Sequence, residues 1–175
     1  LRKDAVQDMV RAITALNAVM HDPEDVLRFT VARIEVSPNS SNSVAERVRF
    51  SIDLRHPDKD VLLPRGDAIE RVVQGAMTSC TATVTERFHA LPTAFDPLVP
   101  DAVERAARAQ GLGALRLASG AFHDAQFMSR LCPTGMIFVP SRAGVSHHPS
   151  EYTDPAQLAA GARVLTAVLA ELAAR

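Results

Sequence analysis

Apolar residues in the first part of the chain follow a helical spacing and then a strand-like one. From Asp4 to about His21 they recur three or four positions apart, which predicts an amphipathic helix that packs one face on a sheet. Leu27–Val36 and Val44–His56 instead alternate with polar residues, the two-residue period of half-buried strands. The loop between them is rich in Ser, Asn and Pro, so a β-hairpin is predicted. The residues expected to face the core are Val6, Met9, Val10, Ile13, Leu16 and Met20 in the helix, Ala32, Ile34 and Val36 in the first strand, and Val48, Phe50, Ile52 and Leu54 in the second.

Two further elements and a connector complete the first half. A helical pattern covers about Gly66–Met77, and a strand pattern follows over Cys80–Phe88. The order αββαβ with short connections predicts two helices on one face of an antiparallel sheet. Three prolines fall in the connector Leu91–Pro100, which places a domain boundary between residues 1–92 and 93–175.

The second half has the pattern of an α/β domain. Helices are predicted over Asp101–Gln110, over Asp124–Leu131, and from the Asp154–Pro155 cap to about Ala174. A short strand is predicted at Leu115–Leu117. The continuous apolar run Met136–Val139 predicts a second strand, covered on both faces. These are pieces of an α/β domain in the order βαβα, too few to complete one. The last helix is expected to pack through Leu158, Leu165, Val168, Leu169 and Leu172.

Composition narrows the classes of function. Hydrophobic residues make up 47% of the 175, enough for a core, and no stretch is expected to reach the ~18–20 apolar residues of a membrane span. A net charge of −1 without a basic block gives no electrostatic footprint for nucleic acid. Cys80 and Cys132 are too few and too distant for a disulfide framework, and we expect no secretory signal before the first helix. We therefore expect a cytoplasmic protein with reduced thiols.

Candidate chemistry is concentrated between Ser119 and Tyr152. A polar loop with two adjacent histidines, His147 and His148, follows the apolar run, and open α/β sheets bind ligands at the carboxyl ends of their strands. Pro149 restrains this loop, and a rigid loop suits a metal ligand because an imidazole must be held in one orientation. From these residues alone, a solvated surface histidine remains the alternative.

Several short motifs in this region occur in order and resemble those of a known family. SGAFHDA, PTGMIFVPS and GVSHHPSEYT are similar to the C-terminal signature of the N-carbamoyl-L-amino-acid hydrolases and allantoate amidohydrolases. These are dinuclear-metal amidohydrolases related to the M20 peptidases. The resemblance implies that His147 is a metal ligand and that Gly120 and His123 line the substrate pocket.

Three positions in these motifs need separate comment. The family usually has Gly where this chain has Phe122, at a place that lies against the substrate, so the resemblance implies an altered pocket. His148 replaces a common Asn. Asp124 is either a neighbour of the substrate together with His123 or the N-cap of the following helix.

The first half resembles the lid or dimerisation domain of the same family. The stretches LRKDA, IEVSPNSSN and SIDLRHPD carry this similarity. That domain is a ferredoxin-like βαββαβ sandwich, so the chain is expected to lack its first strand. The resemblance implies that Asn42, in the hairpin, and Arg55, at a strand end, contact the substrate. A guanidinium suits this role because its forked donors match a carboxylate.

The resemblance implies a metal-dependent hydrolase that cleaves the N-carbamoyl (ureido) C–N bond of an N-carbamoyl-L-amino acid or allantoate. Its cofactors are two divalent ions, Zn, Mn, Co or Ni, which polarise the amide and activate a water molecule. The general-base Glu and most metal ligands of the family precede the lid, so this chain alone is expected to bind metal poorly and to be inactive. A homodimer through the lid is expected. Two alternatives stay open: an M20-type peptidase or aminoacylase, and a non-catalytic dimerisation module.

Overall fold

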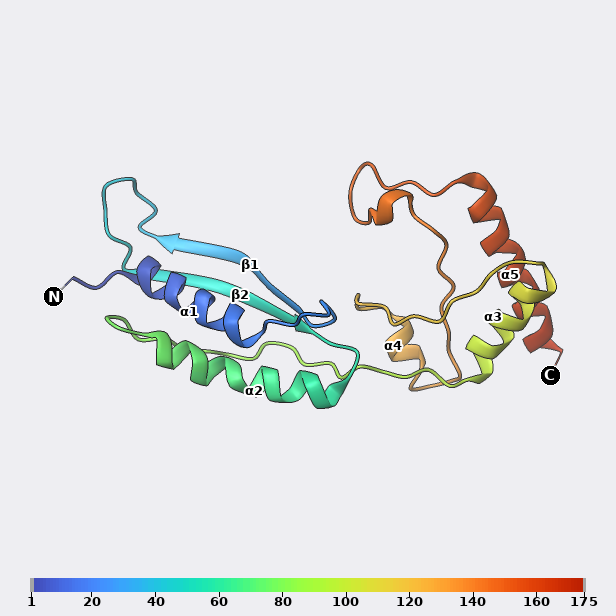
Figure 1. The fold of residues 1–175 in the computed structure, drawn as a ribbon, viewed down its shortest axis with the longest axis horizontal. Coiled ribbons are helices and arrows are strands. Elements are labelled where there is room, and N and C mark those ends of the chain that lie inside the picture. The colour runs from blue at the N-terminus through green and yellow to red at the C-terminus, as the bar shows by residue number, and fades with distance from the viewer. Residues whose placement is uncertain (1, 175) are drawn as a thin grey trace. The chain divides into compact units, whose positions relative to one another are not determined.

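The chain is divided into two units, Leu1–Pro92 and Thr93–Arg175. The computed structural model describes residues 2–174. The first unit holds α1 (Ala5–Val19), β1 (Arg28–Ser37), β2 (Arg47–Arg55) and α2 (Lys59–Ala76), and the second holds α3 (Leu98–Ala109), α4 (Ala125–Met128), the 3-10 helix η1 (Arg142–Gly144) and α5 (Pro155–Ala173) (Figure 1).

β1 and β2 form the predicted antiparallel hairpin. A bulge between Val31 and Ile34 adds one residue to β1, so Val31 pairs with Ile52 and Ile34 pairs with Phe50. The prediction that Ala32 shares a face with Ile34 is therefore wrong, because the bulge resets the two-residue period. The apolar pairs of the hairpin are Phe29 with Leu54, Val31 with Ile52, Ile34 with Phe50, and Val36 with Val48. Phe29, Ile52 and Leu54 pack against the core, whereas Ile34, which was also expected to face it, is 48% exposed.

The buried face of α1 is narrower and more polar than the sequence pattern predicts. Asp4 caps the helix, its carboxylate accepting the backbone N–H of Gln7 at 3.3 Å. Val10, assigned to the packing stripe, is 48% exposed. The face that is buried consists of Ala5, Asp8, Ala12, Leu16 and Met20.

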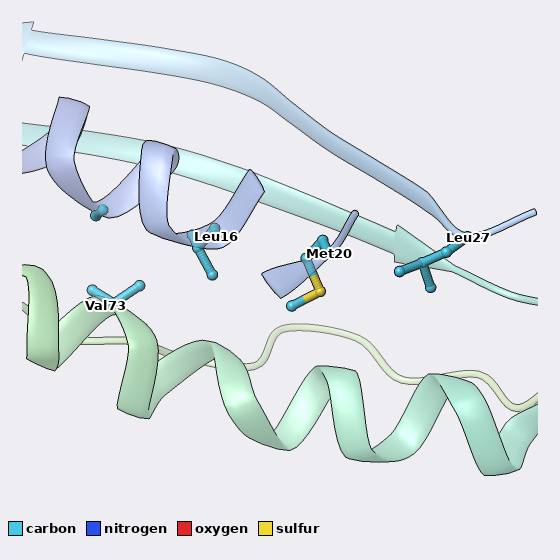
Figure 2. Packing of buried hydrophobic residues seen from close by; sticks show 5 residues of the cluster. Leu16, Met20, Leu27 and Val73 are labelled. Carbon is cyan, nitrogen blue, oxygen red and sulfur yellow. The ribbon is translucent and has the colours of Figure 1, made fainter. Parts of the chain in front are cut away.

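The core of the first unit lies between the two helices and the hairpin. Figure 2 shows Leu16 of α1 and Met20, which follows the helix as its C-cap, pointing toward α2, with Val73 of α2 pointing back and Leu27 at the end of the cluster. Leu16 is fully buried. Apolar side chains on both strands, including Phe29 and Leu54, pack against this cluster, so both helices cover the same face of the hairpin.

Asp8 links α1 to the turn that follows α2. Its carboxylate accepts the hydroxyl of Thr78 at 2.7 Å and the backbone N–H groups of Ser79 and Cys80 at 2.9 and 2.8 Å. Arg11 adds an ion pair at 2.7 Å. These bonds, the Thr78 hydroxyl first among them, hold the pKa of Asp8 well below its ordinary 3.8. The buried charge is therefore satisfied by donors from a segment about 70 residues away.

α2 begins earlier than predicted. Asp58 caps it by accepting the N–H of Asp60 at 2.8 Å, and the helix then continues through Pro64. The sequence pattern suggested a start at Gly66, because a proline usually interrupts a helix. Pro64 is the sixth residue of the helix, so the carbonyl of Asp60 lacks its usual N–H donor, and the helix continues past this missing bond.

The strand predicted at Cys80–Phe88 is not formed. The sheet of the described residues has only β1 and β2. Ala82 and Val84 still pack against the core, and the side chain of Gln74 donates to the carbonyl of Ala82 at 2.9 Å. The apolar side chains thus take the places expected of a strand, but an extended segment becomes a strand only when another backbone pairs with it.

In the second unit, α3 packs against α5. Ala102, Ala106 and Ala107 of α3 meet Val164 and Val168 of α5 in a small core. Gly161 of α5 lies against Val139, whose Cγ1 would stand 2.6 Å from a Cβ at that position. The apolar run thus crosses α5 where a glycine leaves room for it.

The strands predicted in the second unit are absent among residues 93–174, and Phe138 is 54% exposed instead of covered on both faces. The predicted 124–131 helix is reduced to α4, Ala125–Met128. α5 packs through Val164 and Val168, whereas Leu158, Leu165 and Leu169 are about half exposed.

By its length and composition, α5 could also cross a membrane, since its mean hydropathy is 1.3. The expectation that no stretch is apolar enough for a membrane span is thereby corrected. Core helices of soluble proteins pass the same test.

Candidate functional site

The histidine loop is closed at its base by Arg142 and Tyr152. The N–H of Arg142 donates to the carbonyl of Tyr152 at 2.8 Å, and its guanidinium lies 4.1 Å from the centre of the Tyr152 ring. Inside the loop, the hydroxyl of Ser141 donates to the carbonyl of Val145 at 2.6 Å. The loop is therefore held by its own contacts, a feature that the motif did not predict.

His147 lies at the tip of this loop in a left-handed backbone conformation, with φ 57°. Its N–H donates to Oε2 of Glu151 at 2.8 Å, and its side chain is exposed. Such a conformation is uncommon for a residue other than glycine and persists only where neighbouring contacts fix it. Glu151 thus holds the backbone of His147 in this conformation.

The residues present do not form a metal site by themselves. Among residues 2–174, no group of three or more His, Cys, Asp or Glu side chains could hold a metal ion. Protein sites for transition metals need three or four ligands, and His147 supplies one.

The SGAFHDA segment brings Gly120 and His123 into one turn before α4. Nε2 of His123 lies 2.7 Å from Oγ of Ser119, and the ring of Phe138 lies 5.7 Å from the imidazole. Gly120 has open space where a Cβ would stand. The Ser119–His123 pair was missed at the sequence level, although two polar residues four apart around a glycine turn were the available signal.

Phe122 and Asp124 take roles of their own in this turn. Phe122 is 44% exposed, and its ring meets that of Phe127 edge-on at 5.5 Å. Asp124 occupies the N-cap position of α4, but its side chain makes no capping hydrogen bond, so the capping alternative is not supported.

Arg55 ends β2 and forms a two-pronged ion pair with Asp53. Its Nε and Nη2 donate to Oδ1 and Oδ2 of Asp53 at 2.6 and 2.7 Å. The pair lowers the pKa of the Asp53 carboxyl and raises that of Arg55, and both side chains are about half exposed. A ligand carboxylate would have to displace Asp53 or share the guanidinium with it.

Asn42 lies in the hairpin loop, where its Oδ1 accepts the hydroxyl of Ser40 at 2.8 Å. It precedes the start of β2 at Arg47, whereas Arg55 is the last residue of that strand. Eight residue steps of a strand span about 26 Å. Asn42 and Arg55 therefore lie toward opposite ends of the hairpin (Figure 1).

Comparison with known proteins identifies the family. The family model described as Peptidase family M20/M25/M40 matches residues 6–171. The chain belongs to this family. The prediction of an M20-type protein from the motifs is thus confirmed, and its mixture of helices with a small antiparallel sheet agrees with the solved structures of the family.

Curated relatives narrow the comparison within the M20 family. The chain is 37% identical over 174 residues to the allantoate amidohydrolase of Bacillus subtilis, covering 98% of this chain. It is 34% identical over 174 residues to the N-carbamoyl-L-amino-acid amidohydrolase of Paenarthrobacter aurescens, again over 98% of the chain. A crystal structure of an amidase of the hydantoinase/carbamoylase family from Burkholderia vietnamiensis matches 97% of the chain with a TM-score of 0.89 and 35% identity. The chain spans 42% of the length of each of these proteins.

Proposed function

We propose that this M20-family chain is part of a metal-dependent amidohydrolase that cleaves the C–N bond of a ureido compound, an N-carbamoyl-L-amino acid or allantoate. The observation that carries the proposal is the match over 98% of the chain to two relatives whose names describe this chemistry. The ordered motifs around His147 and Arg55 support it, because both curated activities act on substrates that combine a ureido group with a carboxylate.

Each candidate residue has a role in this proposal. His147 is a ligand of one of two divalent ions, Zn, Mn, Co or Ni, whose other ligands and general base lie in a longer protein. Arg55 binds the substrate carboxylate, Asn42 makes a polar contact, and Gly120 and His123 line the pocket. The rigid loop around His147 supports its role, since Glu151 and the Arg142–Tyr152 contact would fix a ligand in one orientation.

We assign residues 1–92 to the lid and residues 93–175 to the C-terminal part of the catalytic domain. In the longer protein, a further strand would pair with the Cys80–Phe88 segment and complete a ferredoxin-like lid. Two observations support this: that segment already packs Ala82 and Val84 inward without a ladder partner, and α5 leaves Leu165 and Leu169 about half exposed for further layers. We expect this protein to be cytoplasmic.

We further propose a homodimer in which the two subunits share each active site. A small ureido molecule cannot contact Asn42 and Arg55 of one subunit if they are separated along β2 by about 26 Å. If both contact substrate, one of them comes from the partner.

Subunit mixing tests the shared site in the protein encoded by the reading frame that contains this chain. Asn42→Ala and Arg55→Ala proteins are each expected to be impaired. Dissociated and reassociated together in equal amounts, they should recover about one quarter of wild-type activity, because half of the dimers are mixed and each mixed dimer has one intact site. Recovery of no activity would contradict a shared site.

A substrate panel tests the function itself. The same longer protein, loaded with Mn²⁺ or Zn²⁺, is assayed for ammonia release from N-carbamoyl amino acids and allantoate. Cleavage of dipeptides and N-acetyl amino acids, the substrates of the peptidase and aminoacylase classes, is followed by release of the free amino acid. We expect turnover of the ureido compounds only. Preferential cleavage of peptides would move the chain to another branch of the M20 family. The 175-residue chain is expected to show no turnover under the same conditions.

A further inference from the structure

Ser119 and His123 form a pair whose geometry restricts the imidazole. Oγ of Ser119 lies 2.7 Å from Nε2 of His123 and also accepts the N–H of Ala121 at 3.2 Å. The Phe138 ring lies 5.7 Å from the imidazole at an angle of 59°. Both Ser119 and His123 are half-buried. The ring is thus held at Nε2 and covered on one side.

The hydrogen bonds distinguish the two neutral tautomers of His123. If the Ser119 hydroxyl donates a hydrogen bond to Nε2, its oxygen still accepts the N–H of Ala121, so the hydroxyl uses both its donor and an acceptor position. If Nε2–H donates instead, the hydroxyl accepts twice, and no other acceptor for its own hydrogen is found among residues 2–174. The first arrangement satisfies more groups, and the bond at one ring nitrogen determines where the proton resides.

We propose that Ser119 is a positioning residue that holds His123 as the Nδ1–H tautomer, so that the ring presents an N–H donor to an acceptor oxygen of a ligand. No protein partner of Nδ1 occurs in the described part of the chain. Only the identity of the ligand rests on the proposed function, under which the acceptor is a carboxylate or ureido carbonyl oxygen of the substrate.

Nitrogen NMR of the 175-residue chain tests the tautomer directly. Long-range proton–nitrogen spectra of histidine-labelled protein, recorded above the titration range of histidine, distinguish a protonated from an unprotonated ring nitrogen at each of the six histidines. Loss of one signal set in His123→Gln assigns the residue. We expect Nδ1 of His123 to carry the proton. A proton on Nε2 in the wild-type chain would overturn the proposal, whatever any variant does.

Two substitutions separate positioning from packing. In Ser119→Ala, we expect the ratio of Nδ1–H to Nε2–H to fall about tenfold, the equilibrium effect of one lost hydrogen bond. Ser119→Thr keeps the hydroxyl and should keep the wild-type tautomer. An unchanged ratio in Ser119→Ala would show that Ser119 does not set the tautomer. If Ser119→Ala does not fold, the wild-type and Ser119→Thr spectra still decide.

Kinetics of the longer protein separate this inference from the proposed function. Ser119→Ala should raise KM for a ureido substrate more than it lowers kcat, with Ser119→Thr close to wild type. If even the wild-type protein shows no ureidohydrolase activity, the proposed function fails while the NMR result for Ser119 stands. If the protein is active and Ser119→Ala matches wild type in KM and kcat, the donor is not used on the substrate.

Discussion

Truncation of Leu16 is expected to destabilise one unit of the chain and leave the other unchanged. Leu16 is fully buried between α1, α2 and the hairpin. Leu16→Ala removes three carbon groups, which costs about 2.4 kcal/mol in transfer free energy at about 0.8 kcal/mol for each. The cavity left behind raises the cost to roughly 3–4 kcal/mol. For a unit of about 90 residues this corresponds to a fall in Tm of roughly 12–32 °C.

The chain contains its own probe for separating the two units. It has one tyrosine, Tyr152, and no tryptophan, so tyrosine fluorescence reports on the second unit, whereas far-UV circular dichroism reports on both. In Leu16→Ala, we expect the transition of the first unit to move to lower urea and the Tyr152 transition to stay in place. Val168→Ala, in the α3–α5 core, should move the Tyr152 transition instead.

Val10→Ala is the matched control, because Val10 lies on the same helix but is 48% exposed. We expect its free energy of unfolding to stay within about 0.5 kcal/mol of wild type. An equal loss of stability in Val10→Ala and Leu16→Ala would show that burial does not set the cost. A shift of the Tyr152 transition in Leu16→Ala would show that the two units unfold together.

Three other substitutions test the carboxylate link, the α5 packing and the proposed substrate contact. The pKa of Asp8 is lower in the folded than in the unfolded chain, where it is about 3.9, so the charged carboxylate stabilises the fold above that pH. This stabilisation is lost as the pH falls through the folded pKa. In urea titrations, the stability advantage of wild type over Asp8→Asn should therefore be full above about pH 5 and shrink below pH 4. Gly161→Ala should destabilise the Tyr152 transition by about 1–3 kcal/mol, because the new methyl group overlaps Val139, and should be tolerated in a Val139→Ala background. In the longer enzyme, Arg55→Lys should lower kcat/KM by about 10- to 100-fold, the worth of a charge-assisted hydrogen bond, while Arg49→Lys, exposed on the same strand, should leave it unchanged.

Local patterns predicted the elements whose stability is local. The hairpin, the helix α1 and the Asp154–Pro155 start of α5 follow from periodicity and capping, which depend on neighbouring residues. The Cys80–Phe88 strand could not be predicted this way, since its formation depends on a partner backbone elsewhere. The bulge in β1 was equally invisible, because one inserted residue changes the face of every residue beyond it.

For the candidate site, too, the sequence predicted some features and not others. Motifs identified the segments that carry His147, His123 and Arg55, but the contacts that orient these side chains come from the fold. The residues that bond to these groups are close to them in sequence, yet no spacing rule singles them out. They are Asp53, which bonds to Arg55, Ser119, which bonds to His123, and Glu151, which bonds to the backbone of His147. Asp8, the most buried charge among residues 2–174, was not singled out from the sequence, because its donors lie about 70 residues away.

The metal content of the longer protein tests the central claim, that His147 is one ligand of a metal centre completed by other residues. Purified wild-type protein and His147→Ala are saturated with Mn²⁺ or Zn²⁺, freed of excess metal and analysed for bound ions per chain, with His148→Ala as the neighbouring control. We expect two ions in wild type and in His148→Ala, and at least one ion fewer in His147→Ala. Equal metal content in wild type and His147→Ala would contradict it.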